Sequence, residues 1–322
     1  MTVLILTSPE DVTADLVVAA LRDRGTPVVR LDPADLPGEV SLSAAYVRGD
    51  VRGHLSVRER TVTMDGVRSI WVRRPGTPGA GTGTGTAEQS QWLTAEAGGA
   101  LYGALRCVPA RWMNHPAAAA QARYKPWQLF TAHRCGFAVP ATLITTCPKA
   151  AREFAEEHPQ LVVKSVSGTH PGDPPLALPT TLVPADADFS AVAGGPTLLQ
   201  QYIPKAADIR LTCVGTGLYA ARKRTAPDQV DGRFGGPADA DWEPVEPPAR
   251  IAESVRKYMS SAQLAYGAFD FAEDSEGGWW FLECNQGGQF GFVELATGQP
   301  ITAAIADWLT GRQDDRVPHG TP

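Results

Sequence analysis

Cysteine is scarce in this chain of 322 residues, and its five copies form no pattern. They are odd in number, lie scattered between Cys107 and Cys284, and include no CxxC pair. A disulfide framework and a zinc site are therefore not indicated. We expect reduced thiols, most of them buried, because free cysteine is among the residue types most often found inside proteins.

Long apolar runs and an excess of basic residues are also missing. No run approaches the roughly 18 residues that a membrane span needs. The opening MTVLILTSPED meets acid where a signal peptide would be basic. The net charge of −6 argues against broad nucleic-acid binding, which needs a basic footprint. We therefore expect a cytoplasmic protein that binds neither membranes nor nucleic acids.

The composition is that of a globular protein, with 43% hydrophobic and 20% charged residues. A chain of this length predicts two or three packed α/β units. It opens with the strand VLIL, a helical stretch and the strand PVVRLD, which is the β-α-β start of a parallel sheet. Segments near 41–47, 53–59 and 61–64 alternate like antiparallel strands, and a further strand follows at 69–75.

Two helices and two loops stand out in the rest of the chain. Apolar spacing predicts helices at about 88–107 and 117–135. The glycines of the segment 76–86 superficially resemble a GxGxxG turn, but the segment is low in complexity, so we expect a loop and no nucleotide-binding turn. This loop and the segment 226–241, rich in proline, glycine and aspartate, are candidate lids over a site.

The strongest signal is the stretch AFDFAEDSEGGWWFLECNQGGQFGFVE. It predicts two strands joined by a turn, with Asp270 on the first strand and Glu283 and Asn285 on the second. Side chains two residues apart on a strand share a face, and hairpin pairing can bring Asp270 beside them. Three oxygen ligands suit Mg²⁺, which leaves its other positions to water and nucleotide phosphate. The stretch therefore predicts a metal site in an enzyme that handles ATP.

A lysine in the apolar strand of LVVKSVSGTH is a second signal. Lys164 is unexpected there unless its charge has a partner. It precedes a turn of small residues, with Gly168 and Thr169, whose backbone N–H groups could approach phosphate oxygens. The alternative is an edge-strand lysine that points to solvent. Lys125, on the helix 117–135, has a weaker case by itself, since such a lysine usually lies on the wet face.

The order of the motifs resembles that of the ATP-grasp ligases. The segments that carry the resemblance are NHP, ARYKPWQLFTAHRCGFAVPAT, VVKSVSGT, LLQQYIPKAADIRLTCVG, AARKR and GAFDF with FLECNQGGQFGF. They span residues from about 112 to 309. Within that superfamily the chain is most similar to the peptide-modifying branch related to ribosomal protein S6 glutamate ligases, in particular the actinobacterial graspetide synthetases. The strand SIWVRRP also resembles this branch.

The resemblance implies an α/β (α+β) fold, the ATP-grasp fold with an extra N-terminal domain. The expected parts are a pre-ATP-grasp α/β domain at 1–112, a central lobe at 113–198, a C-terminal lobe with the metal site at 199–311, and a flexible tail at 312–322.

The resemblance also implies where ATP binds. Lys125 and Lys164 would contact the α and β phosphates, a hinge strand would pair its backbone with adenine, and Asp208 would reach the ribose. The expected set is Lys125, Lys164, Gly168, Thr169, Gln200, Gln201, Tyr202, Ile203 and Asp208. Many relatives carry Glu at the position of Gln201, so the adenine contact would fall to an amide or to the backbone.

Arginines supply the remaining predicted functions. By resemblance, Arg210 and Arg222 or Arg224 would lie near the γ-phosphate and the acyl phosphate. Arg222 and Arg224 share one face of their strand, and Lys223 lies on the other; the sequence leaves open which face lines the site. A solvated cationic face is the alternative, and for Asp208 and Arg210 it is a surface ion pair.

The pair Arg73 and Arg74 ends the strand SIWVRRP. Arginine forks bind carboxylates in bidentate fashion, so this pair would suit an Asp or Glu side chain of a peptide substrate. Two surface charges at a strand end are the alternative.

The implied function is macrocyclisation of a ribosomal precursor peptide with a leader and a core. With ATP and Mg²⁺, the enzyme would activate Asp or Glu side chains as acyl phosphates and join them to Ser or Thr hydroxyls or Lys amines. A homo-oligomer is expected. Two alternatives stay open: a ligase that adds a free amino acid to a protein or small acid, and a catalytically silent nucleotide- or peptide-binding subunit. The presence of Lys164, Asp270, Glu283 and Asn285 counts against the silent subunit.

Overall fold

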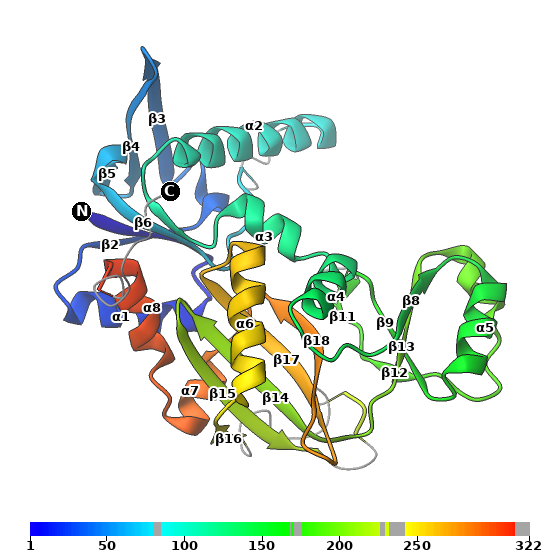
Figure 1. The fold of residues 1–322 in the computed structure, drawn as a ribbon. Helices are drawn as coiled ribbons and strands as arrows, with labels where there is room; N and C mark the ends of the chain where they lie inside the picture. The colour runs from blue at the N-terminus through cyan, green and yellow to red at the C-terminus, as the bar shows by residue number, and fades with distance from the viewer. Residues whose placement is uncertain (80–84, 168, 171–175, 226–228, 232–241, 313–322) are drawn as a thin grey trace.

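The first strand of the chain lies inside a parallel sheet of order β2-β1-β6-β7 in the computed structural model (Figure 1). Its members are β1 (Thr2–Leu6), β2 (Val28–Leu31), β6 (Val67–Val72) and β7 (Arg111–Met113). Side chains alternate along β1, so that Val3 and Ile5 face one core while Leu4 and Leu6 face another. The expected β-α-β start is confirmed.

The structure describes residues 1–79, 85–167, 169–170, 176–225, 229–231 and 242–312. Gly168 lies outside these residues. So do the middle of the loop 76–86, most of the loop 226–241 and nearly all of the expected tail.

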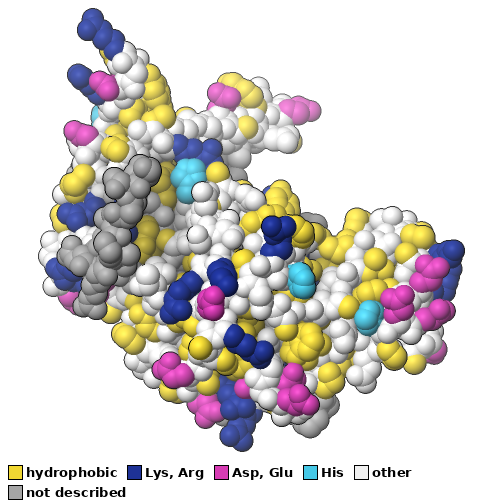
Figure 2. Space-filling view, viewed as in Figure 1, with side chains coloured by type: hydrophobic (Ala, Val, Ile, Leu, Met, Phe, Trp, Pro, Cys, Tyr) yellow, Lys and Arg dark blue, Asp and Glu magenta, His cyan; other side chains and the backbone are white. Residues whose placement is uncertain are grey.

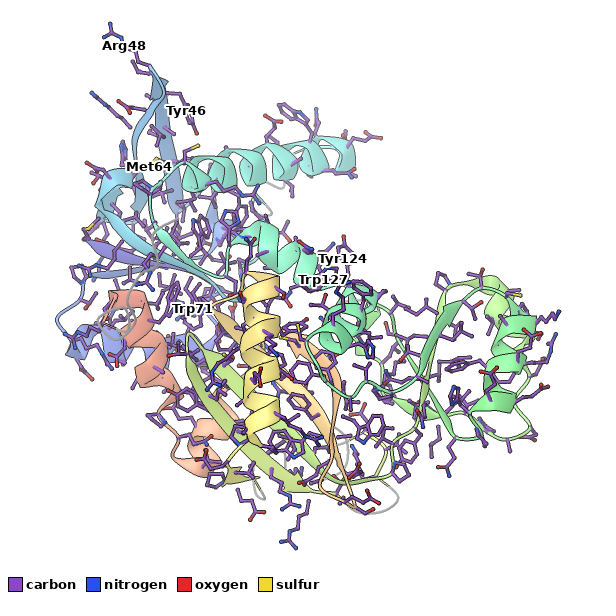
Figure 3. The ribbon with its side chains drawn as sticks, in the orientation of Figure 1. Tyr46, Arg48, Met64, Trp71, Tyr124 and Trp127 are labelled. Atoms are coloured by element: carbon purple, nitrogen blue, oxygen red, sulfur yellow. The ribbon has the colours of Figure 1, made fainter. Side chains whose placement is uncertain are left out.

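Both faces of the parallel sheet are covered. On one face lie α1 (Val12–Asp23) and α8 (Ile301–Thr310), which pack against each other. On the other face lie α2 (Ala87–Arg106) and a small antiparallel sheet of β3 (Val40–Val47), β4 (Asp50–Val57) and β5 (Arg60–Thr63). Short 3-10 turns, η1 (Pro33–Asp35) and η2 (Met64–Gly66), connect these elements. Figure 3 shows Tyr46 and Arg48 at the tip of the β3–β4 hairpin, pointing away from the body.

The helix expected at 117–135 is two helices, α3 (Pro116–Ala122) and α4 (Lys125–Arg134). The expectation of one continuous helix is wrong. Tyr124 between them has extended backbone, with φ −77° and ψ 112°, and Pro126 lies in the first turn of α4. A proline inside a continuous helix would remove a hydrogen bond and clash with the preceding turn, whereas at a helix start it fits. The break directs the N-terminal end of α4, with Lys125, toward the site.

The central sheet has the order β12-β9-β13-β8. Its strands are β8 (Thr142–Thr145), β9 (Leu161–Lys164), β12 (Thr181–Leu182) and β13 (Thr197–Gln201), packed with α5 (Pro148–Glu157) and the 3-10 helix η3 (Phe189–Gly194). A two-stranded ladder, β10 (Thr169–His170) with β11 (Leu176–Ala177), lies in the segment between β9 and β12. The domain boundary expected between 198 and 199 falls inside β13, because this strand pairs with β9 as far as Gln201.

A five-stranded antiparallel sheet of order β16-β15-β14-β17-β18 forms the C-terminal lobe. Its strands are β14 (Lys205–Val214), β15 (Gly217–Arg224), β16 (Trp242–Val245), β17 (Tyr266–Asp274) and β18 (Trp279–Asn285). One face packs on α6 (Ala249–Ala262) through an aromatic cluster that includes Tyr258, Phe269 and Phe281. The other face packs near α7 (Gly291–Thr297) and α8. The predicted hairpin at 269–285 is confirmed as β17 and β18.

One hydrophobic core joins the N-terminal domain to the C-terminal sheet. It contains Trp71 of β6, labelled in Figure 3, together with Tyr266 of β17 and Phe290, which precedes α7. Because residues from both ends of the chain fill this core, the N-terminal domain and the C-terminal lobe pack as neighbours. The central lobe projects to one side of them (Figure 1).

The surface carries mixed charge. On the face drawn in Figure 2, Lys and Arg side chains are interspersed with Asp and Glu, and they form no single basic patch among the described residues. None of the described helices is both long enough and apolar enough to span a membrane. All five cysteines are free thiols, and Cys135, Cys213 and Cys284 are buried.

Candidate functional site

Three charged side chains form a row across the C-terminal sheet. Arg210 on β14 lies directly opposite Asp270 on β17, which in turn lies opposite Glu283 on β18. Directly opposed residues of antiparallel strands project from the same face. The Nε atom of Arg210 is 2.7 Å from Oδ1 of Asp270. The structure therefore places the two predicted metal-binding carboxylates side by side and adds a cation to the row.

The two carboxylates and Asn285 fit a hard divalent cation. Asn285 follows Glu283 by two residues and lies opposite Ala268, and its Oδ1 accepts a 3.0 Å hydrogen bond from the N–H of Gly287. In the described part of the chain, no group of three or more His, Cys, Asp or Glu side chains could hold a metal ion. Two carboxylates with an amide oxygen make a sparse set, which suits Mg²⁺ bound mainly by water and phosphate.

Lys125 connects the row to the central lobe. At the start of α4, its Nζ donates a 3.0 Å hydrogen bond to the carbonyl oxygen of Ser165 and lies 3.5 Å from Oε2 of Glu283. Ser165 directly follows β9, so one ammonium group reaches residues of both lobes. By itself, a lysine on a predicted amphipathic helix was weak evidence for a function of Lys125. The helix break at Tyr124 explains its position.

Lys164 ends β9 and faces the same space. Its Nζ donates a 2.8 Å hydrogen bond to Oε1 of Gln200, whose Nε2 donates in turn to Oγ1 of Thr142. Burial lowers the pKa of Lys164 to about 8; the nearby Glu283 raises this pKa, and Lys125 lowers it further. The hydrogen-bond partner of Lys164 is therefore the neutral amide of Gln200, which does not balance the positive charge of the lysine. Thr169 begins β10, and Gly168 lies outside the described residues.

The expected hinge follows β13. The N–H groups of Gln201 and Tyr202 donate 2.8 Å hydrogen bonds to the carbonyl oxygens of Ala141 and Gln160. Ile203 is buried, and within the described residues its N–H donates no backbone hydrogen bond. Of the four hinge residues expected to face adenine, Ile203 is therefore the one that offers an open backbone donor.

Asp208 lies on β14, two residues before Arg210 and on the same face. Its carboxylate accepts a 2.6 Å contact from Lys205 Nζ and a 3.3 Å hydrogen bond from Thr225 Oγ1. Burial raises the pKa of Tyr202, and the charge of Asp208 adds to this effect. Asp208 thus lies between the hinge and the row.

The register corrects the expectation for Arg222 and Arg224. Arg222 lies opposite Ile209, on the face that packs against α6, and its Nε is 2.7 Å from Oε2 of Glu273. Arg224 shares this parity and is exposed at the end of β15. The residue on the face of the row is Lys223, opposite Asp208. The two-residue turn Gly215-Thr216 fixes this pairing, and it was a signal from which the register could have been predicted.

Arg73 is also placed differently from the expectation. It is only 6% exposed, and burial lowers the pKa of its guanidinium. Its Nη1 donates to the carbonyl oxygen of Gly287, its Nη2 donates a 2.7 Å hydrogen bond to Oε1 of Gln289, and its Nε is 3.8 Å from Oδ2 of Asp11. Arg73 is therefore not available to bind a peptide carboxylate, because its guanidinium already contacts Gly287, Gln289 and Asp11. Arg74 is exposed.

The loop 286–289, which follows the last metal-ligand candidate, is clamped by side chains from several elements. Its four consecutive carbonyl oxygens accept from Asn114, Arg73, the Tyr266 hydroxyl and Arg210, in that order. Gly288 has no room for a side chain, since an added Cβ would lie 2.5 Å from the Cβ of Ala268. Sequence reasoning assigned no function to Asn114, although it begins the NHP segment of the resemblance, or to Tyr266, which lies just before the stretch that carries Asp270.

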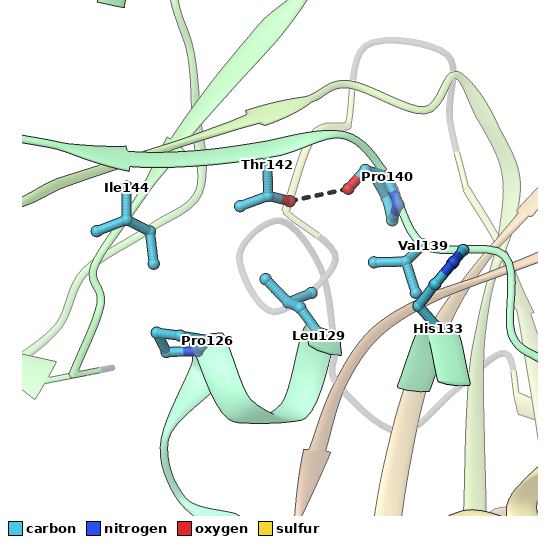
Figure 4. Close-up of a pocket in the computed structure, with 7 residues that line it drawn as sticks. All are labelled: Pro126, Leu129, His133, Val139, Pro140, Thr142 and Ile144. Carbon is cyan, nitrogen blue, oxygen red and sulfur yellow. Dashed lines mark hydrogen bonds between the residues drawn. The ribbon is translucent and has the colours of Figure 1, made fainter. Parts of the chain in front are cut away.

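A cleft of about 410 Å³ lies beside the start of α4 (Figure 4). Pro126, Leu129 and His133 of α4 form one wall, and the segment from Val139 to Ile144 forms the other. Thr142, which holds Gln200, donates a hydrogen bond to the Pro140 carbonyl at this rim. The cleft is mostly apolar, and its lining includes Pro126, the residue that follows Lys125. Figure 3 shows Tyr124 and Trp127 at the neighbouring α3–α4 junction.

Comparisons with known proteins show what the chain as a whole is similar to. Residues 2–119 match the family model of the MvdD pre-ATP grasp domain. No curated protein sequence is significantly similar to the chain.

Several solved structures are similar over nearly the whole chain. A RiPP-associated ATP-grasp ligase from Chryseobacterium gregarium, in complex with ADP and a leader and core peptide, is 25% identical, covers 97% of both chains and has a TM-score of 0.87. The macrocyclase MdnC from Microcystis aeruginosa MRC, bound with the precursor peptide MdnA, is 25% identical over 97% of this chain and 100% of its own, with a TM-score of 0.85. The macrocyclase MdnB from the same organism is 28% identical over 96% and 98%, with a TM-score of 0.79.

Proposed function

We propose that this ATP-grasp ligase, a member of the ADP-forming class with a pre-ATP-grasp domain at its N-terminus, closes rings in a ribosomally made precursor peptide. The observation that carries the proposal is the row Arg210, Asp270 and Glu283 on one lobe, faced by Lys125 and Lys164 from the other side. The structures most informative for comparison are RiPP ligases and macrocyclases that bind ADP or precursor peptides.

ATP is proposed to bind between the two lobes. The N–H of Ile203 is available for the adenine edge, Asp208 for the ribose hydroxyls, and Lys125 and Lys164 for the phosphates. Asp270, Glu283 and Asn285 would hold Mg²⁺, which neutralises phosphate charge when bound. A solved relative with 20% identity contains Mg and ADP, consistent with this pairing.

The chain's own residues serve phosphoryl transfer by position and charge. A peptide carboxylate oxygen forms a bond to the γ-phosphorus while the bond to the β–γ bridging oxygen breaks, which gives an acyl phosphate and ADP. Arg210 and the two lysines offset negative charge as it develops, and no enzyme nucleophile is needed. A Ser or Thr hydroxyl or a Lys amine then attacks the acyl carbon and releases phosphate. The attacking group's proton leaves with the released phosphate, which departs as HPO₄²⁻.

A precursor peptide with leader and core is the proposed partner. Relatives are solved with such peptides. A leader that stays bound would raise the local concentration of the core at the site, so one chain could close several rings.

Intact-mass spectrometry of a candidate precursor peptide tests this function. After incubation with enzyme, ATP and Mg²⁺, ring closure predicts a loss of about 18 Da per bond, because each condensation removes one water. The loss should require ATP and disappear with Glu283→Gln. A gain of an amino-acid residue mass would identify a ligase of free amino acids instead. An unchanged mass with every candidate, despite tight ATP binding, would favour a silent binding subunit.

A further inference from the structure

We propose that Lys223 is an oxyanion-binding residue of the site, an assignment that rests on the proposed function. Its ammonium group would take an oxygen of either the nucleotide phosphates or the peptide carboxylate that is being activated. Neither the sequence motifs nor the comparisons single out this residue.

The strand register carries the first part of the argument. Lys223 lies opposite Asp208, and Ala221 lies opposite Arg210, so these four residues project from one face of the sheet. The same register places Asp270 on that face. Lys223 is thus the diagonal neighbour of Arg210, a separation of roughly 7–8 Å between backbones, which a lysine side chain can bridge.

Burial without a partner carries the second part. Lys223 is only 9% exposed. Its ammonium makes no hydrogen bond or ion pair with any residue that the structure describes. Buried lysines are rare unless their charge is paired, because removal of an unpaired charge from water is costly. A bound anionic ligand would supply the counter-ion that Lys223 lacks among the described residues.

Among the described residues, the carboxylate directly opposite Lys223 already has other partners. It belongs to Asp208, which contacts Lys205 and Thr225. On the other side, Lys223 lies opposite Trp242 of β16, whose ring contacts Phe292. The same Phe292 ring lies 5.5 Å from the guanidinium carbon of Arg210. Lys223 and Arg210 therefore flank one aromatic-walled part of the face, where an anion would meet both cations.

A packing function is the competing explanation. The aliphatic stem of a lysine can cover apolar surface while the charge contributes little. The two explanations differ in whether the positive charge of Lys223 is needed. Lys223→Met keeps most of the aliphatic stem and removes the cation, whereas Lys223→Arg keeps the cation. Arg224→Met, at the exposed end of the same strand and of opposite parity, is the matched control.

The test combines nucleotide calorimetry with steady-state ring formation. Affinities for AMPPNP with Mg²⁺ and for ADP with Mg²⁺ are measured for each variant, together with KM and kcat for the precursor peptide. If Lys223 holds phosphate, Lys223→Met weakens AMPPNP binding about tenfold, the usual size of a lost charged hydrogen bond. ADP binding falls as well only if an α or β oxygen is the partner. If it holds the carboxylate, nucleotide affinities are unchanged and KM for the peptide rises about tenfold. Lys223→Arg restores most of either loss.

The proposal is overturned if Lys223→Met matches Arg224→Met within twofold in all of these quantities. It is also overturned if the loss is accompanied by a lower melting temperature and Lys223→Arg does not rescue it. A wild-type protein that binds AMPPNP but modifies no precursor would refute the proposed function separately. In that case the nucleotide affinities alone decide, and equal affinities reject the assignment of Lys223.

Discussion

The two lobes that hold the candidate site differ greatly in how they are buried. The C-terminal sheet is covered on both faces, by the aromatic cluster under α6 and by the core it shares with the N-terminal domain. The central sheet packs α5 and η3 around a small cluster of four buried residues: Ala151, Leu161, Val192 and Leu199. Each lobe nevertheless supplies charged groups to one site.

This difference in burial suits the two lobes to different functions, positioning of charged groups and movement. The carboxylates Asp270 and Glu283 and the cation Arg210 lie on the heavily buried sheet, so their spacing is set by strand register. Lys164 lies on the lobe with the smaller core, and regions with few buried contacts open more readily. Lys125, which contacts both lobes, lies at their junction. We infer that the central lobe moves onto a nucleotide that the C-terminal sheet positions.

The largest effect is expected on the well-buried side, from Glu283→Gln. The proposal that Glu283 binds Mg²⁺ beside Asp270 predicts that loss of this charge lowers ATP-dependent ring formation about 10²–10³-fold. ADP affinity without Mg²⁺ should change little. Product mass and calorimetry check the two quantities. Glu276→Gln, an exposed carboxylate in the turn of the same hairpin, is the control and should keep full activity. Equal losses in both variants would contradict a specific metal function.

Arg73→Lys tests whether the N-terminal domain holds the loop 286–289. A lysine cannot reproduce the fork that reaches Gly287 and Gln289. The free energy of unfolding should therefore fall by about 2–4 kcal/mol, measured by chemical denaturation. Arg74→Lys, its exposed neighbour, should change it by less than about 0.5 kcal/mol. Unchanged stability with a raised KM for the peptide would instead restore the original prediction that Arg73 binds substrate.

The pH dependence of ADP affinity tests Lys164, on the central lobe with its smaller core. Burial lowers the pKa of Lys164 to about 8, so its ammonium is present below pH 8 and lost as the pH rises above it. Because phosphate binds the charged form, affinity should weaken about tenfold between pH 7 and pH 9. Lys164→Arg should flatten this dependence, since arginine stays charged. Parallel pH profiles for wild type and variant would show that Lys164 does not control binding.

The smallest effect on activity is expected from Arg222→Gln. Its partner Glu273 is left buried without a cation, which should cost about 1–2 kcal/mol of unfolding free energy. Turnover of the folded protein should stay within about threefold of wild type, because Arg222 lies on the face away from the row. A large loss of kcat with normal stability would mean that the arginine acts in catalysis after all.

Much of the fold followed from local patterns in the sequence. The parallel start, the antiparallel meander and the hairpin with Asp270 and Glu283 all have clear periodicity or turn signals, and the structure contains each of them. The break before Lys125 was not predicted, because the apolar spacing continues across it. Pro126 was the local signal that a new helix begins there. The domain boundary expected between 198 and 199 cuts β13, because the lobe to which a strand belongs depends on its pairing partner, here β9.

The site was harder to predict where it depends on distant partners. Strand parity alone could say that Lys223 and Arg222 face opposite ways. Only pairing with Asp208 and Ile209 says which of the two faces the row. The hydrogen bonds from Arg73 to Gly287 and Gln289, more than 200 positions away, have no local signal in the sequence. The clamp on the loop 286–289 likewise arises from tertiary packing.

Hydrogen exchange followed by mass spectrometry tests the comparison between the lobes most directly. Amides of 161–164 and 197–203 should exchange faster than those of 207–214 and 266–272 in the free protein. AMPPNP with Mg²⁺ should then slow the central-lobe amides strongly and the C-terminal sheet only slightly. If bound nucleotide, verified by calorimetry, left 161–164 and 197–203 unprotected, the site would not lie between the two lobes and the account would be wrong.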